Sequence, residues 1–137
     1  MKVREAMAKT VTSARKTDKV SEIAKKMKQE DAGFIPVIEG ELVIGVITDR
    51  DIVIRCIAEG HDPRSETAEH LMSKQVTTVG PDDDMEEAGR KMAQDEIRRL
   101  PVAENGRLVG VLSHGNLVQA TKNKIAEKAT EGVTRGA

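Results

Sequence analysis

The sequence predicts a protein of the α/β class, α+β type, made of two similar β-α-β-β-α units that each cover the other's apolar face. Three observations support this prediction. The chain repeats itself, each copy combines one apolar helix face with short apolar strands, and turn residues separate the strands. At 137 residues the chain is long enough for two small halves that share a core.

The duplication is the most informative feature of the sequence. Residues 3–53 align with residues 68–118 at a constant offset of 65 without a gap, and about 15 of the 51 pairs are identical. Two copies are too few for a solenoid, so they predict a pseudo-symmetric pair. The matched segments include Met7 with Met72, Val11-Thr12 with Val76-Thr77, Pro36-Val37 with Pro101-Val102, and Gly45-Val46 with Gly110-Val111.

Each copy begins with an extended piece and a helix. The piece holds Val11-Thr12 or Val76-Thr77, and we expect the aspartate that follows, Asp18 or Asp83, to cap the helix N-terminus. The helix carries apolar residues on one face: Val20, Ile23, Ala24 and Met27 in the first copy, and Met85, Ala88, Gly89 and Met92 in the second.

Two strands and a second helix complete each copy. The strands cover residues 35–38 and 42–47, or 100–103 and 108–112, and glycine-containing turns separate them. The second helix is expected near residues 49–58 and 115–124, with a frayed tail over 130–137. The predicted organisation is a first unit (1–58), a polar linker (59–67), a second unit (68–124), and a helix end and tail (125–137).

Composition argues against several classes of function. The net charge of −1 gives no basic excess for nucleic acid, and the single aromatic residue, Phe34, cannot form a stacking platform. Every apolar run is shorter than the roughly 18 residues that span a bilayer. The lone Cys56 fits a reducing compartment, and no metal-ligand spacing appears. We therefore expect a cytoplasmic protein without nucleic acid, membrane or metal as partner.

The chain resembles the CBS (cystathionine beta-synthase) domain family over nearly its whole length. The residues that carry the resemblance recur in both copies: the Met7 and Met72 segments, the Pro-Val strands, and residues 45–51 with 110–116. The resemblance implies a Bateman module, in which two units are related by a pseudo-twofold axis and pack through their sheets. It also implies two clefts between the repeats that commonly hold adenosine derivatives, and a homodimer.

The motif Thr48-x-x-Asp51 stands where a strand is expected to become a helix. A carboxylate there can accept hydrogen bonds from both ribose hydroxyls, while a threonine hydroxyl and free helix amides can donate to phosphate. The same spacing is typical of a capping box that only closes a helix end. The two roles are compatible, and the motif alone does not separate them.

The resemblance implies a full ligand set for the cleft that contains this motif, which we call the first cleft. Arg98 and Arg99 would face phosphate groups there, although an arginine pair in a loop is also an ordinary solvated feature. The implied set is Val46, Thr48, Asp51, Val76, Thr77, Ile97, Arg98, Arg99 and Pro101. In the second cleft Asn116 replaces the carboxylate and Gly33-Phe34 replaces the arginine pair, so we expect one good site per chain.

The leading hypothesis is a regulatory module that binds AMP, ADP or ATP between its repeats and signals through a change of shape or dimer packing. It needs no cofactor, and the sequence leaves open whether Mg²⁺ accompanies the nucleotide and which protein is regulated. The alternative is a ligand-free structural homodimer or protein-interaction module. We do not expect an enzyme, because no positioned base, nucleophile or metal set appears.

Overall fold

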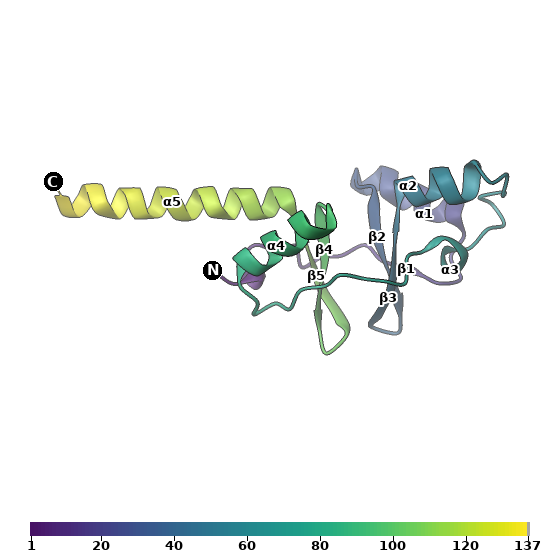
Figure 1. Cartoon of the computed structure of the whole chain (residues 1–137), viewed down its shortest axis with the longest axis horizontal. Helices are drawn as coiled ribbons and strands as arrows, with labels where there is room; N and C mark the ends of the chain where they lie inside the picture. The colour runs from purple at the N-terminus through teal and green to yellow at the C-terminus, as the bar shows by residue number, and fades with distance from the viewer. Residues whose placement is uncertain (137) are drawn as a thin grey trace.

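The computed structural model describes residues 1–136, with side chains through residue 132. Two β-hairpins stand side by side and join into one five-stranded sheet of order β1-β2-β3-β5-β4, with α1, α2 and α4 at one end of the hairpins (Figure 1). The predicted α+β class is confirmed, and the first repeat has the complete β-α-β-β-α order. In the second repeat the first strand is reduced to a single bridge between Val79 and Val102.

The elements follow the duplication. The first repeat contains η1 (Val3–Glu5), β1 (Ala14–Arg15), α1 (Val20–Glu30), β2 (Phe34–Glu39), β3 (Leu42–Thr48), α2 (Asp49–Asp51) and the π-helix η2 (Ile52–Ile57). The second repeat contains α3 (Ala68–Leu71), α4 (Met85–Asp95), β4 (Arg99–Glu104), β5 (Arg107–Ser113) and α5 (His114–Gly136).

The two hairpins are built in the same register. Pro36 lies opposite Val46 in the first, and Pro101 lies opposite Val111 in the second. In both hairpins the register shifts directly after the valine that follows this proline. Only Leu42 and Arg107 pair across the β3–β5 junction, so the hairpins meet at one end and diverge toward the other.

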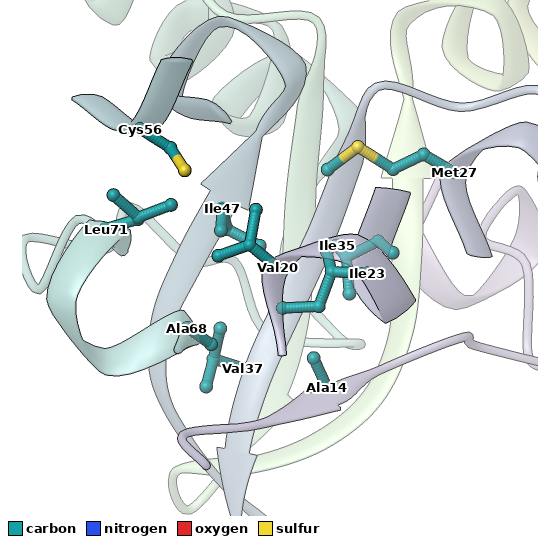
Figure 2. Packing of buried hydrophobic residues seen from close by; sticks show 10 residues of the cluster. All are labelled: Ala14, Val20, Ile23, Met27, Ile35, Val37, Ile47, Cys56, Ala68 and Leu71. Atoms are coloured by element: carbon teal, nitrogen blue, oxygen red, sulfur yellow. The ribbon is translucent and has the colours of Figure 1, made fainter. Parts of the chain in front are cut away.

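The hydrophobic core consists of two clusters, and each cluster includes residues from the other repeat. Ala68 and Leu71 lie in the cluster of the first repeat, where Leu71 is beside Cys56 and Ala68 is beside Val37 (Figure 2). Val3 is fully buried in the cluster of the second repeat. The first segment of each repeat therefore packs into the core of the other repeat, a crossover that the alignment alone does not reveal.

The chain that links these packed residues to the rest of each repeat, which we call the crossing segment, runs along a strand of the other repeat. Ser73 exchanges two backbone hydrogen bonds with Val46 on β3, and Ala8 does the same with Val111 on β5. A glycine precedes each valine and makes the approach possible. A Cβ at Gly45 would stand 2.7 Å from Met72 Sδ, and one at Gly110 would stand 2.8 Å from the Ala8 carbonyl oxygen.

The predicted N-caps at Asp18 and Asp83 are wrong. Both carboxylates accept a backbone N–H from three residues earlier, that of Arg15 at 2.9 Å and that of Gly80 at 2.7 Å, and so close the turn before the helix. The caps lie one residue later, at Lys19 and Asp84, and only the Asp84 side chain accepts a helix N–H. A short carboxylate side chain can accept a hydrogen bond in a tight turn as well as at a helix cap, so an aspartate just before a helix does not by itself indicate a cap.

The closing helices differ from the prediction in two ways. The helix expected near residues 49–58 forms, but residues 52–57 are π-helical, in a run whose β-branched Ile52, Val53 and Ile54 are crowded in an α-helix. Residues 130–136, predicted as a tail, continue α5 away from the sheet (Figure 1). Good helix formers, Lys, Ala and Glu, fill much of residues 122–131. Residue 137 lies outside the described residues.

A largely buried carboxylate anchors the end of the polar linker. Glu66 Oε1 lies 2.6 Å from His70 Nδ1 and accepts the Thr67 N–H at 3.1 Å, while Oε2 lies 3.6 Å from His61 Nδ1. The side chain is 13% exposed. The hydrogen bond from His70, followed by that from Thr67, holds the pKa of Glu66 below its usual value.

We predict that Glu66→Gln destabilises the fold near neutral pH, because the charged acceptor between the two imidazoles is lost. The lowered pKa means that this stabilisation is fully present above about pH 4.5 and disappears as pH falls through the folded-state value. Urea unfolding followed by circular dichroism at pH 7 and at pH 3 measures it. A deficit in the variant that does not shrink at pH 3 would contradict this assignment.

Two glycines provide a matched test of the packing. In Gly89→Ala the new methyl group of α4 would lie 3.7 Å from Leu117 Cδ1 of α5, an ordinary van der Waals contact. We therefore expect a gain of about 0.5–1 kcal/mol in unfolding free energy. Gly110→Ala should destabilise, because its methyl group meets the Ala8 carbonyl oxygen. Urea melts of both variants test this, and equal effects would argue against the crossing.

Candidate functional site

The motif in the first cleft forms a complete capping box. Thr48 Oγ1 accepts the Asp51 N–H at 3.2 Å, and Asp51 Oδ2 accepts the Thr48 N–H at 2.9 Å. The second repeat builds the same box, in which Ser113 Oγ accepts the Asn116 N–H at 3.0 Å and Asn116 Oδ1 accepts the Ser113 N–H at 3.3 Å. The capping interpretation of the Thr48 motif is therefore confirmed, and the second repeat has an equivalent box that was not predicted.

The box uses one carboxylate oxygen of Asp51 and leaves the other for further interactions. Oδ1 lies 3.8 Å from Arg55 Nε, and the side chain is 17% exposed. Arg55 also donates to the Leu71 carbonyl oxygen at 3.1 Å, so its guanidinium joins η2 to the crossing segment. Asp51 thus stands at the helix start as an anionic acceptor that can still receive hydroxyl donors.

The structure outlines a cleft of about 300 Å³ between the repeats, on the second-cleft side. Its walls come from the first crossing segment, the end of α1 with the start of β2, and the β5–α5 junction. Arg99 reaches it from β4. The lining residues are Ala8, Thr10, Val11, Thr12, Glu30, Ala32, Phe34, Ile35, Pro36, Arg99, Val111, Ser113 and Asn116.

The lining of the second cleft corresponds to the ligand set expected for the first. Each lining residue has a counterpart 65 positions away in the other repeat. Val11, Thr12, Ala32, Phe34, Pro36, Val111, Ser113 and Asn116 are the counterparts of Val76, Thr77, Ile97, Arg99, Pro101, Val46, Thr48 and Asp51. Eight of the nine expected residues therefore lie at positions that line a cleft in the opposite repeat.

Arg98 is the exception among the nine, since its counterpart, Gly33, does not line the cleft. A Cβ at Gly33 would meet the Asp49 carboxylate, so the exposed Asp49 side chain would have to turn away to admit a larger residue there. The Arg98 side chain is exposed, and its carbonyl oxygen accepts the His114 N–H at 2.7 Å. In this structure Arg98 therefore acts through its backbone, which joins the start of β4 to the start of α5.

The other expected residues lie along the crossing segment and the start of β4. The Val46–Ser73 pairing brings β3 against the segment that leads to Val76 and Thr77. Thr77 Oγ1 donates to Asp95 Oδ2 at 2.6 Å, so this hydroxyl already has a partner. Ile97 is half-buried against the second core cluster, and Pro101 is buried.

Arg99 is the residue whose placement differs most from the expectation. The resemblance implies a place in the first cleft, whereas the structure places Arg99 in the lining of the second. Its side chain is half-buried and makes no hydrogen bond or ion pair with any residue in the described range 1–136. The alignment contained a signal for this placement, because it pairs Arg99 with Phe34, the only aromatic residue of the sequence.

Two further properties follow from the described part of the chain. Residues 1–136 contain no group of three or more His, Cys, Asp or Glu side chains arranged to hold a metal ion. Within the same range, none of the helices combines the length and the apolar character that crossing a membrane requires.

Comparison with known proteins identifies relatives over nearly the whole chain. The CBS domain family matches residues 3–57 and again residues 68–123. The CBS domain-containing protein YhcV of Bacillus subtilis is 35% identical over 133 residues, which cover 96% of this chain and 94% of the relative.

Solved structures agree with this assignment. The crystal structure of Hypoxic Response Protein I with two coordinated zinc ions is 29% identical, with a TM-score of 0.79 over 88% of this chain and 98% of that one. The CBS domain pair of protein MJ0100, in complex with 5′-methylthioadenosine and S-adenosyl-L-methionine, is 22% identical. Its TM-score is also 0.79, over 90% and 98% of the two chains, and at that identity it supports the fold alone.

The two capping boxes make a matched stability prediction. Thr48→Ala and Ser113→Ala should each lower the unfolding free energy by about 1 kcal/mol, because each removes the acceptor for a helix N–H. Circular dichroism during urea unfolding measures this in a chain without Trp or Tyr. Thr17→Ala, an exposed change outside both boxes, is the control. A Thr48→Ala protein as stable as this control would show that the box does not hold the helix end.

Proposed function

This chain belongs to the CBS domain family, and on that premise we propose that it is a regulatory module that binds an adenine nucleotide in the first cleft. One observation carries the proposal. Eight of the nine residues expected to bind the ligand are counterparts of residues that line a 300 Å³ cleft between the repeats. That volume is at the lower end of the range typical of small-molecule sites.

The first cleft has the chemistry that a ribosyl phosphate needs. Asp51 supplies a carboxylate with one oxygen outside the capping box, and ribose hydroxyls donate strongly to such an acceptor. By the pseudo-symmetry Arg99 would border the first cleft as well as the second, and its half-buried guanidinium has no partner among the described residues. The second cleft offers the neutral Asn116 in place of the carboxylate. Asp51 therefore favours the first cleft for a ribose.

The protein MJ0100 offers a fold-level precedent, since its CBS pair holds adenosine derivatives. A nucleotide that contacts both repeats would couple their relative positions. The size of the resulting change is limited by the difference in the nucleotide's affinity for the two arrangements. The module would pass this change to a second copy of itself or to a separate regulated protein. We place this activity in the cytoplasm and assign it no catalytic step.

A second candidate function is a protein-interaction module without a ligand. It is favoured by one observation, an exposed apolar face on η2 formed by Val53, Ile54 and Ile57, which are 57%, 44% and 54% exposed. Nucleotide binding separates the two candidates, because an interaction module would show no stabilisation by AMP, ADP or ATP.

We predict that Asp51→Asn weakens AMP binding about tenfold, because a neutral amide replaces a charged acceptor for the ribose hydroxyls. The amide oxygen can still accept the Thr48 N–H, as Asn116 does for Ser113, so the helix end is preserved. Isothermal titration calorimetry measures the dissociation constant.

Asp49→Asn is the matched control, because Asp49 is exposed and accepts only the N–H of its neighbour Arg50. We expect its affinity for AMP to equal that of the wild type. Equal affinity in Asp51→Asn as well, or no heat and no thermal shift with AMP, ADP and ATP, would refute the proposal.

A further inference from the structure

The duplication places two equivalent positions, 34 and 99, at the boundary between the two clefts, and only one of them holds a cationic side chain. Phe34 and Arg99 are counterparts, and both line the second cleft. Among the lining residues, they are the one pair related in this way. Because the pseudo-symmetry exchanges the two residues, the equivalent lining of the first cleft contains the same pair. Positions 34 and 99 therefore lie between the clefts, and only Arg99 is charged.

The backbone of Arg99 is fixed, while its side chain is available. Arg99 opens β4 opposite Ser113, and the next residue, Leu100, is fully buried. The guanidinium has no hydrogen-bond or ion-pair partner in the described range, in contrast to Arg4, which donates to Asp82 at 2.8 Å. This long side chain has several rotatable bonds, so a bound anion can redirect its guanidinium while the backbone stays in place.

We propose that the two clefts share the guanidinium of Arg99, so that a phosphate group bound in one cleft weakens phosphate binding in the other. The inference rests on the proposed function and concerns its regulation. A guanidinium binds a phosphate most strongly when one fork pairs with it bidentately. Two phosphates on one guanidinium would also bring two negative groups close together, which is unfavourable. With Arg99 engaged in the first cleft, an anion entering the second meets Glu30 and the neutral Phe34.

The consequence is negative coupling between two sites of one chain. The first phosphorylated ligand binds with Arg99, and the second binds without it at a cost of about tenfold or more in dissociation constant. Asp51 directs the first ligand to the first cleft. Over a broad range of concentration the chain therefore holds one phosphorylated ligand.

Two variants that fill one cleft each provide the test. Val111→Phe places a larger side chain in the second cleft, and Val46→Phe does the same at the counterpart position in the first. Each protein is titrated with AMP by calorimetry, alone and combined with Arg99→Ala. Sharing predicts that Arg99→Ala weakens AMP binding at least tenfold in both single-cleft proteins. Arg90→Ala, on the exposed face of α4, should weaken it in neither.

The outcomes separate this inference from the proposed function. If Arg99→Ala weakens AMP binding only in the Val111→Phe protein, or if the Val46→Phe protein binds no AMP, sharing is wrong and the first-cleft assignment stands. Weakening only in the Val46→Phe protein contradicts both sharing and the place of Arg99 in the first cleft. No AMP binding by the wild type contradicts the proposed function itself. Should circular dichroism show that a phenylalanine variant is unfolded, wild type and Arg99→Ala are compared over both binding steps. Sharing then requires that both steps weaken.

Discussion

The exchange of leading segments between the repeats is the constraint on which the rest of the molecule depends. Val3 is fully buried in the core of the second repeat, and Leu71 is almost fully buried in that of the first. Full burial of such a side chain contributes about 1.5–3 kcal/mol. The exchange also sets the path of the chain, because each segment must cross a strand to reach its destination. Gly45 and Gly110 are the places where the crossing backbone comes closest.

The clefts result from this crossing. Residues 8–12 run from the Val111 pairing toward β1 and form one wall of the second cleft, and residues 73–77 take the equivalent path from Val46. The backbone is therefore closely symmetric, with the same hairpin register, the same irregularity and the same capping box in each repeat. The chemistry is not symmetric, because Asp51 corresponds to Asn116 and Arg99 corresponds to Phe34 in the other repeat. Divergence after duplication affected side chains that line the clefts and left the supporting bonds in place.

The sequence was sufficient to predict what is local or repeated. Apolar periodicity located α1 and α4, turn residues located the hairpins, and the Thr48 spacing predicted a box that the structure contains. It was insufficient where the outcome depends on distant contacts. Asp18 and Asp83 close a turn instead of capping a helix because each helix starts one residue later than expected, and the sequence pattern does not fix a helix start that closely. The destinations of Val3 and Leu71, and the side of the strand to which Arg99 extends, depend on tertiary packing that neither periodicity nor spacing encodes.

The exchanged segments also bear on the origin of the chain. A single ancestral copy would have had a buried position in its core that its own leading segment does not fill, and a leading segment without a site of its own. Two such polypeptides could satisfy each other by reciprocal docking, so the simplest ancestor is an obligate pair of identical short chains. Fusion of the two genes would then have removed the dependence on concentration and allowed the two halves of each boundary pair, such as positions 34 and 99, to evolve separately.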